Sequence, residues 1–318
     1  MTKHTTKQRE GDAESERGTR AGRRGRGAVE TLGSKSASRL HAEPIPSHAA
    51  RVAEAFDVDQ IGGSHALQTL CDVVVLAGDT ARKHFQQGVV AETKPDRSPV
   101  TLADHETEQA IRDAVLQRYP DAEFFGEETG RHGNNAGLRF IVDPIDGTRA
   151  FVRGLPTWSV LVGIEAHGQP VVGIAYMPAS EDLFVGVLGS GATHNGDPVR
   201  VSGVARLSDA TVMLGSLQQF TETGMGGALP RIATATDSAR GYPDFDGYRQ
   251  VLLGRADAMV DPGVKPYDVC AAAVLVREAG GRFTSMAGED TIYGGSAIAS
   301  NGKVHEALVA AVKAPDAE

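Results

Sequence analysis

The chain has few cysteines, few aromatic residues and no long apolar run. Its two cysteines, Cys71 and Cys270, cannot make a disulfide framework for 318 residues, which predicts a reducing, cytoplasmic location. No stretch of about 18 or more apolar residues occurs, so we expect no transmembrane span. The basic N-terminus lacks the apolar segment of a secretory signal. Aromatic residues make up only 5% of the chain and there are 38 glycines, which favours an α/β or α+β enzyme over an all-β sandwich.

The charge is distributed unevenly along the sequence. The formal net charge is −9, but residues 1–45 contain ten Lys or Arg against six Asp or Glu, which leaves −13 for the rest. Such an acidic body does not suit nonspecific binding to nucleic acid, so no nucleic-acid partner is expected. Clustered carboxylates in an acidic body do suit hard cations such as Mg²⁺.

The first 60 residues differ in composition from the rest. They are rich in Lys, Arg, Glu, Ser, Thr and Gly and show no apolar period. We therefore predict a disordered basic tail over residues 1–60 and one domain over residues 61–318. The arginine-rich stretch at residues 20–26 is typical of a solvated extension, with a nucleic-acid arm as the alternative.

Apolar periodicity and turn residues indicate the elements of the domain. Helices are expected from an N-cap at Ser64, from 101 to 119 behind a capping box, near 246–254 and from 267 to 279. Strands are expected at 89–92, at 138–142 ending at Asp143, within 158–201 and at 257–260. This order predicts a layered α/β/α/β/α fold in which the N-terminal and C-terminal halves meet at a cleft.

The strongest chemical signal is the sequence Asp-Pro-Ile-Asp-Gly-Thr at residues 143–148. The proline fixes the backbone between two carboxylates, and Gly147 allows a ligand to approach closely. Asp143 and Asp146, with a main-chain carbonyl between them, can bind two neighbouring Mg²⁺ ions through oxygen. The Thr148 hydroxyl and the nearby N–H groups then face the position of a phosphate. The alternative is an ordinary strand-to-helix turn, because Asp, Pro, Gly and Thr are all turn residues.

Three further acidic residues lie at the ends of expected elements. Glu127, in the Gly-Glu-Glu of residues 126–128, can add a ligand to the same metals or belong to a solvated acidic turn. Asp268 lies at the start of a very apolar helix, and Asp104 lies at the start of another. Helix capping is the alternative role for each of these two.

Together, these acidic elements resemble the inositol monophosphatase superfamily. The family's first signature matches residues 143–148 without departure, and its Gly-Glu-Glu matches residues 126–128. Its Trp-Asp-x-Ala-Ala motif appears as Tyr-Asp-Val-Cys-Ala at residues 267–271. The two replacements in that motif do not touch a metal ligand. The resemblance covers about residues 64–312 and implies the sugar-phosphatase-like version of the layered fold, with the active site in the cleft.

The resemblance implies a ligand role for five residues in a site of two or three Mg²⁺ ions. Glu127, Asp143 and the carbonyl of Ile145 would hold the activating ion. Asp143, Asp146 and Asp268 would hold a second ion, which would steady the leaving alkoxide during in-line displacement.

The resemblance also implies the catalytic residues. Thr148, hydrogen-bonded to Asp104, would orient or deprotonate the water that the first ion activates. Gly147 and Thr148 would bind the phosphate group of a small substrate.

Three softer motifs resemble the bacterial histidinol-phosphate phosphatases more than the animal inositol enzymes. Asp261 falls where the inositol enzymes carry a substrate-binding Glu, Asp244 falls where they carry a small residue, and Gly241 is the third expected substrate contact. An extra carboxylate near the leaving group suits a cationic amino alcohol better than a neutral polyol. The alternative for Asp244 is a solvated turn residue. The motifs lie at residues 151–158, 240–245 and 264–268.

The sequence therefore predicts an enzyme that hydrolyses a small phosphate monoester, first of all histidinol phosphate, with Mg²⁺. Inositol-1-phosphate and a sugar or aminonucleoside monophosphate are the alternative substrates. A catalytically silent, metal-dependent binding protein is the alternative of another class, and the complete ligand set argues against it. A nucleic-acid binder acting through the tail is opposed by the acidic body. We expect no membrane partner, and a homodimer is the candidate assembly.

Overall fold

The computed structural model describes residues 55–87, 90–94, 99–134 and 137–315, which belong to one compact unit. Residues 1–54 of the predicted tail lie outside the described residues. Residues 55–60, also assigned to the tail, pack on the fold: Phe56 is buried, and its N–H donates to the Leu188 carbonyl at 2.9 Å. The folded unit therefore begins before residue 61, with the 3₁₀-helix η1 Val58–Ile61.

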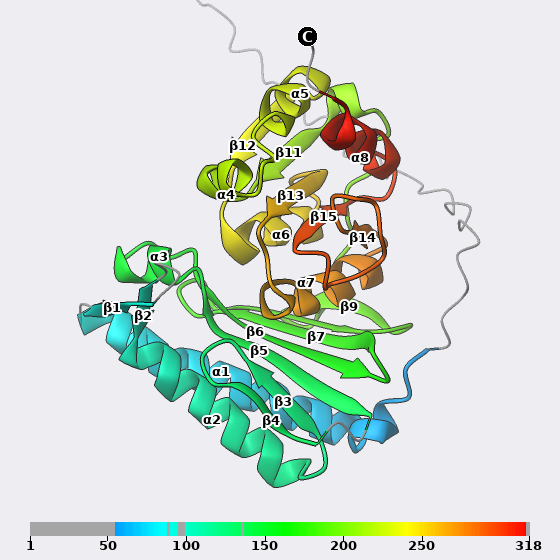
Figure 1. The fold of residues 1–318 in the computed structure, drawn as a ribbon. Helices are drawn as coiled ribbons and strands as arrows, with labels where there is room; N and C mark the ends of the chain where they lie inside the picture. Colours follow the sequence, from blue (N-terminus) through cyan, green and yellow to red (C-terminus); the bar gives the residue numbers. More distant parts are fainter. Residues whose placement is uncertain (1–54, 88–89, 95–98, 135–136, 316–318) are drawn as a thin grey trace, which may run out of the picture. The chain divides into compact units, whose positions relative to one another are not determined.

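Among the described residues, eight strands form a large sheet in the order β10-β9-β8-β7-β6-β5-β3-β4 (Figure 1). Neighbouring strands are antiparallel except for β3 and β5, which are parallel. Every residue of β6 is buried, because helices cover both faces of the sheet. The bounds are β3 Glu123–Gly126, β4 Gly130–Gly133, β5 Leu138–Asp146, β6 Ser159–Ala166, β7 Gln169–Met177, β8 Asp182–Val187, β9 Gly191–His194 and β10 Asp197–Pro198.

Two long helices, α1 Gly63–Gln87 and α2 Leu102–Arg118, cover one face of this sheet. The predicted capping box at the start of α2 is confirmed. The Thr101 N–H and hydroxyl donate to the Asp104 carboxylate at 2.8 and 2.5 Å. The predicted N-cap at Ser64 is wrong, because α1 already begins at Gly63.

Helices α6 Asp244–Leu252 and α7 Pro266–Glu278 lie between the large sheet and a second sheet (Figure 1). Residues 269–276 of α7 are all buried, which explains why this helix is apolar on every side. In the described part of the chain, the second sheet has five strands in the order β12-β11-β13-β15-β14. Their bounds are β11 Thr211–Leu214, β12 Ser238–Gly241, β13 Ala258–Pro262, β14 Arg282–Thr284 and β15 Ser296–Ser300.

Helices on the outer face of the second sheet complete the layers. Separate apolar cores lie between α1–α2 and the large sheet, between the two sheets around α7, and beneath the outer helices. This arrangement confirms the predicted α/β/α/β/α fold. The outer helices are α4 Leu217–Glu222, α5 Ala228–Ala235 and α8 His305–Lys313; the remaining elements are β1 Ala91–Thr93, β2 Pro99–Thr101, α3 Thr148–Val152 and η2 Leu207–Asp209.

Strand β5 differs from its prediction in a way that shapes the site. It does not end before Asp143 but continues to Asp146, with an irregularity between the pairs Asp143–Leu161 and Asp146–Ser159. The intervening Pro144 has no N–H for the ladder, which explains the local break. Both aspartates are thus anchored in the sheet rather than on a loose turn.

Both cysteines are buried and free, Cys71 in α1 and Cys270 in α7. Within the described residues, none of the helices combines the length and the apolar character that crossing a membrane requires.

Candidate metal and phosphate site

The end of β5 holds its two aspartates in defined positions. One oxygen of Asp146 accepts the Ser159 hydroxyl at 3.0 Å and the Phe245 N–H at 2.7 Å. One oxygen of Asp143 accepts the N–H of Ile145 at 3.1 Å. Both carboxylates are buried. Because β6 and the start of α6 bind Asp146, this residue connects the sheet to the layer above it.

Thr148 follows β5 and lies beside the start of α2. Its hydroxyl donates to the Ile145 carbonyl at 3.0 Å and is 3.4 Å from Asp104 Oδ1. The other oxygen of Asp104 is occupied by the Thr101 cap, so capping and contact with Thr148 use different oxygens. Burial raises the pKa of Asp104, and the hydrogen bonds from Thr101 oppose that rise. The structure therefore brings Asp104 and Thr148 together.

Glu127 lies directly after β3, and its N–H donates to the Val142 carbonyl at 3.1 Å. Lys94 Nζ is 2.7 Å from a carboxylate oxygen of Glu127 and 2.6 Å from one of Glu128. Burial raises the pKa of Glu128 to about 7, with Lys94 acting against the rise and Glu127 adding to it. The Gly-Glu-Glu segment is thus held between β5 and a lysine.

Glu108 is a positioning residue of the site that sequence reasoning missed. It is fully buried in α2, and its carboxylate accepts the N–H groups of Glu128 and Thr129, each at 2.8 Å. A Cβ atom at Gly126 would lie 2.4 Å from this carboxylate, so only glycine fits there. The available signal was its spacing: Glu108 follows Asp104 by four residues, which places both on one helix face.

Asp268 lies in the first turn of α7, and one of its oxygens accepts the Lys265 N–H at 2.7 Å. Burial raises the pKa of Asp268 to about 7; the charges of Glu127 and Asp244 add to the rise, while hydrogen bonds from Lys265 and Asp143 lower it. The helix-capping role is therefore real, and it leaves Asp268 within interaction range of the other carboxylates.

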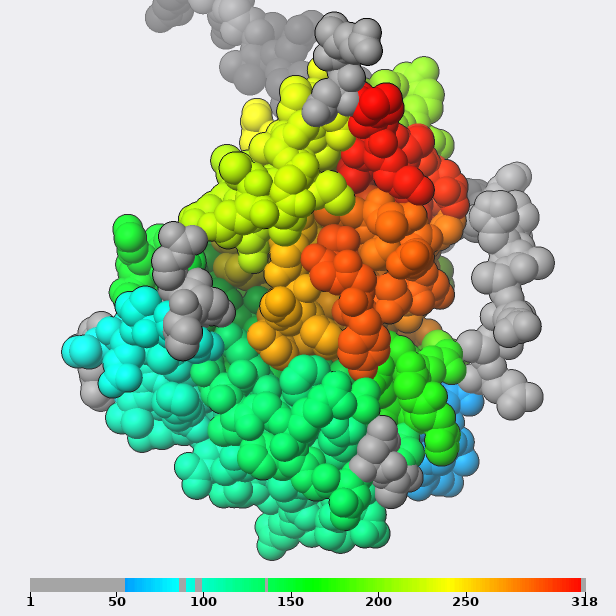
Figure 2. All heavy atoms as spheres, viewed as in Figure 1, coloured from blue at the N-terminus to red at the C-terminus, as the bar shows by residue number. Residues whose placement is uncertain are grey.

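The carboxylates act on one another as one cluster. Burial raises the pKa of Asp143 well above its usual range, and the charges of Glu127, Asp146 and Asp268 raise it further. Burial also raises the pKa of Asp146 well above its usual range, and the charges of Asp244 and Asp268 raise it further. Figure 2 shows the surface hollowed between the yellow-green part of the chain above and the green and cyan parts below it.

The three expected substrate contacts lie in different surroundings. Asp244 is half-buried at the start of α6, and burial raises its pKa to about 6 while Arg149 lowers it. Asp261 is buried in β13 and accepts the Tyr248 hydroxyl at 3.1 Å. Gly241 is exposed at the end of β12, with open space beside it. Of these three residues, Asp244 is the one whose charge raises the pKa of Asp146.

The donor set fits a hard divalent cation. Its side-chain donors are carboxylate oxygens, and these buried negative charges need a cation to remain ionised at neutral pH. Within the described residues, no group of three or more His, Cys, Asp or Glu side chains is arranged closely enough to hold a metal ion. Glu127 instead binds Lys94. The chemistry of the site therefore fits Mg²⁺, and the part that each ligand plays stays a prediction.

Comparison with known proteins identifies the family. The model of the inositol monophosphatase family matches residues 64–316. The chain therefore belongs to this family, whose members are phosphatases that depend on a metal, generally Mg²⁺. This result confirms the resemblance that the motifs indicated, and it makes the chain a phosphoric monoester hydrolase.

Two curated relatives and one solved structure show how far the likeness extends. A histidinol-phosphatase of Mycobacterium tuberculosis is 36% identical over 70% of this chain and 88% of its own length. An inositol-1-monophosphatase of Mesorhizobium japonicum is 30% identical over 79% of this chain and 97% of its own. The crystal structure of the extragenic suppressor protein suhB from Bartonella henselae has a TM-score of 0.73 at 28% identity, covering 79% of this chain and 99% of that one. The relatives thus agree on the chemistry and differ in the named substrate.

Proposed function

We propose that the chain hydrolyses histidinol phosphate with the help of Mg²⁺. The observation that supports this substrate is the place of Asp244. A Cβ atom at Gly147 would lie 2.9 Å from an Asp244 oxygen, so this carboxylate adjoins the turn that we propose as the phosphate site. A carboxylate at that point suits a leaving group that carries a protonated amine, because charge-assisted hydrogen bonds are about twice as strong as neutral ones.

The relatives support the same proposal without deciding it. The M. tuberculosis relative is named a histidinol-phosphatase and the M. japonicum relative an inositol-1-monophosphatase. Inositol-1-phosphate therefore remains the alternative substrate, followed by a sugar or aminonucleoside monophosphate. The two free, buried cysteines support our proposal of a cytoplasmic location.

We propose Glu127, Asp143, the Ile145 carbonyl, Asp146 and Asp268 as the ligands of two or three Mg²⁺ ions. When bound, Mg²⁺ lowers the pKa of a coordinated water and neutralises charge on the phosphate. The hydrogen bonds from Ser159 and the Phe245 N–H to Asp146 keep that ligand oriented.

The proposed catalytic pair is Thr148 and Asp104. The Thr148 hydroxyl reaches the Ile145 carbonyl at 3.0 Å and Asp104 Oδ1 at 3.4 Å, so it can orient a water and pass a proton to the carboxylate. Burial raises the Asp104 pKa, which makes this carboxylate a better proton acceptor. Gly147 and Thr148 are the proposed contacts of the phosphate group.

Among the substrate-binding residues, Asp244 carries the argument. Asp261 is buried and already accepts the Tyr248 hydroxyl, and burial together with Asp244 and Asp268 raises its pKa well above the usual range. A protonated carboxylic acid has no negative charge, so it binds an ammonium group weakly. We therefore propose Asp261 as a support below the site and Asp244 as the contact of the amine.

The test is phosphate release by the purified full chain. Histidinol phosphate, inositol-1-phosphate, a sugar phosphate and a nucleoside monophosphate are compared with Mg²⁺ and with EDTA. We expect kcat/KM for histidinol phosphate to exceed that for inositol-1-phosphate at least about ten-fold, which needs ~1.4 kcal/mol of differential binding. Faster hydrolysis of inositol-1-phosphate would transfer the proposal to that substrate. Absence of release from every ester would favour a catalytically silent binding protein.

A further inference from the structure

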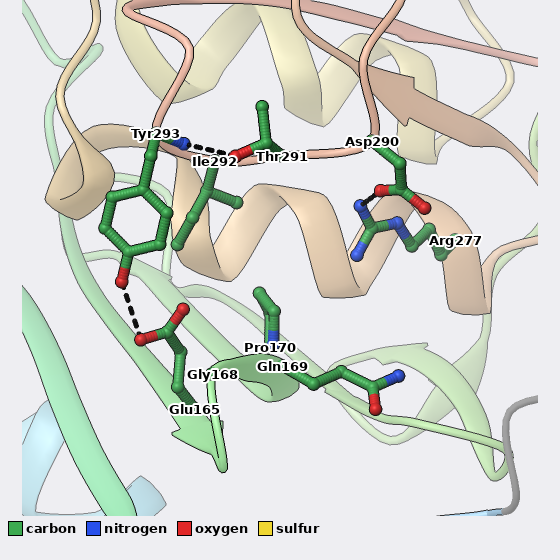
Figure 3. A pocket seen from close by; sticks show the side chains of 9 residues that line it. All are labelled: Glu165, Gly168, Gln169, Pro170, Arg277, Asp290, Thr291, Ile292 and Tyr293. Atoms are coloured by element: carbon green, nitrogen blue, oxygen red, sulfur yellow. Dashed lines mark hydrogen bonds and ion pairs between the residues drawn. The ribbon is translucent and has the colours of Figure 1, made fainter.

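A second pocket lies at the C-terminal end of α7, away from the carboxylate cluster at its start (Figure 3). Its volume is about 290 Å³. That far exceeds the roughly 30 Å³ that one water occupies in the liquid, and it is close to the lower limit of about 300 Å³ for small-molecule sites. The lining side chains used below are Glu165, Pro170, Arg277, Asp290, Ile292 and Tyr293.

Glu165 carries a hydrogen-bond acceptor that the protein leaves unused. Its side chain is 1% exposed, and its Oε2 accepts Arg139 at 2.9 Å and the Tyr293 hydroxyl at 2.7 Å. Its Oε1 is buried and has no hydrogen-bond partner in the described part of the chain. Pro170, opposite Glu165 in the β6–β7 ladder, has no N–H to offer. Leaving such an acceptor unpaired costs about 1–3 kcal/mol, so the pocket favours a donor.

Tyr293 cannot supply the missing hydrogen bond. Burial and the hydrogen bond to Glu165 raise the pKa of Tyr293, so its hydroxyl keeps its proton at neutral pH. That single proton is already directed to Oε2 of Glu165. Figure 3 shows the other oxygen turned away from Tyr293, toward the middle of the lining residues. A donor for Oε1 therefore has to come from outside the described residues, and it reaches this buried atom only when the side chains that cover Oε1 shift.

The opposite side of the pocket carries a positive charge. Figure 3 shows Arg277 there, bound to Asp290. The Asp290 side chain is 78% exposed, and exposed ion pairs are worth about 1 kcal/mol or less, so Arg277 can share its guanidinium with a ligand. Because Arg139 already neutralises Glu165, the pocket does not favour binding of a ligand that carries only a positive charge. The negative charge of Glu165 likewise disfavours a ligand that carries only a negative charge. Pro170 and the buried Ile292 add apolar contact.

We propose that this pocket binds a small zwitterion of amino-acid size, with its ammonium group on Glu165 and its carboxylate on Arg277. The ammonium satisfies the free oxygen of Glu165. The carboxylate gains a guanidinium, which binds it through two parallel hydrogen bonds. The site is separate from the phosphatase chemistry and does not depend on which ester is hydrolysed.

The test measures binding to the full chain by saturation-transfer NMR titration with three probes: L-alanine, ethylamine and propionate. L-alanine has both charged groups, and each other probe has one. We expect L-alanine to bind saturably and at least about five-fold more tightly than either single-charge probe. Equal affinity for ethylamine would indicate a simple cation site and overturn the proposal, as would the absence of saturable L-alanine binding.

Variants locate the binding. Glu165→Gln should lower the affinity for L-alanine at least about ten-fold, and Arg277→Gln should lower it about five-fold. Arg206→Gln, which breaks an exposed ion pair with Asp209, is the matched control and should leave the affinity unchanged. Asp244→Asn should also leave it unchanged, which excludes binding at the phosphatase site. If Glu165→Gln lowers the melting temperature strongly, Arg277→Gln at the exposed side decides; unchanged affinity in that variant would refute the proposal.

Discussion

The carboxylate cluster at the start of α7 and the carboxylate of Glu165 in β6 lie in opposite electrostatic settings. At the start, Asp268 belongs to a cluster of carboxylates that raise one another's pKa. Glu165 instead lies in a network where Arg139 binds both Glu165 and Glu123 at 2.9 Å. The first cluster has more buried negative charge than its lysine and arginine neighbours offset, whereas the second is paired.

The comparison distinguishes carboxylates that lack sufficient cationic partners among the described residues from carboxylates that stabilise the fold through ion pairs. A buried charge is tolerated only when it is paired, protonated or bound to a metal. We propose that the Asp143 group meets this condition through Mg²⁺, whereas the Glu165 group meets it through arginine. Charge removal should therefore affect catalysis in the Asp143 group and stability in the Glu165 group.

The largest effect is expected for Asp146→Asn. It removes one negative charge from the proposed metal site at nearly constant volume, so kcat with histidinol phosphate should fall on the order of 10³-fold, or ~4 kcal/mol. The melting temperature without metal should not fall, because the variant relieves repulsion. Glu165→Gln is the matched control in the arginine-paired group and should stay within about two-fold of wild-type kcat. Near-normal turnover of Asp146→Asn in saturating Mg²⁺ would contradict the assignment.

Arg139→Met should show the reverse pattern. It leaves the buried Glu123 and Glu165 without their shared cation, which should lower the free energy of unfolding by about 3 kcal/mol. Turnover per folded molecule at a permissive temperature should be unchanged. Denaturant titration measures the first quantity and a phosphate-release assay the second. Arg206→Met, which breaks an exposed ion pair, should leave the denaturant midpoint essentially unchanged.

The metal-free protein should become less stable as the pH rises. Burial raises the pKa of Asp244 to about 6 and of Asp268 to about 7, against about 3.9 in an unfolded chain. The folded state therefore holds protons that the unfolded state has released, and stability is lost as the pH rises from about 4 to about 7. The slope is roughly 1.4 kcal/mol per pH unit for each proton.

Saturating Mg²⁺ should flatten this slope, because the metal charge replaces the protons. Unfolding free energies in EDTA and in Mg²⁺ at pH 5 and pH 8 provide the comparison. Identical pH dependence under both conditions would mean that the raised pKa values do not belong to a metal site.

The parts that the sequence predicted are local, and the parts that it missed are distant in the chain. The motif at residues 143–148 and the capping box at Thr101 and Asp104 depend on neighbouring residues, so both could be read directly. The pairing of Arg139 with Glu165 depends on strand register, and the contact of Tyr293 with Glu165 joins residues 128 positions apart. No periodicity marks such contacts.

Short elements of the second sheet were missed for a related reason. Strand β12 has only four residues, none of them buried, so it shows neither an apolar run nor a clear alternation. The start of α6 was placed two residues late, because Asp244 begins the helix with a φ of 57°. A non-glycine residue in that left-handed conformation is uncommon, and propensity gives no sign of it.

The smallest effect, on substrate preference, is expected for Asp244. At the left-handed φ of 57°, alanine would add backbone strain, whereas asparagine tolerates this conformation. Asp244→Asn is therefore the better variant, because it removes the charge and keeps the backbone. In saturating Mg²⁺ it should lower kcat/KM for histidinol phosphate about ten-fold and change that for inositol-1-phosphate about two-fold or less. Steady-state kinetics on both esters measures the ratio.

Two further variants decide what Asp244 does. Asp209→Asn removes a carboxylate that is half-exposed and bound to Arg206, so it should leave both substrates unaffected. Asp244→Ala should lower the melting temperature as well as the preference, since strain adds to the loss of charge. If Asp244→Asn slows both esters equally, Asp244 supports Asp146 and the metal site rather than contacting an amine. The carboxylates at the start of α7 would then form one metal-binding group, and substrate choice would have to come from other residues around it.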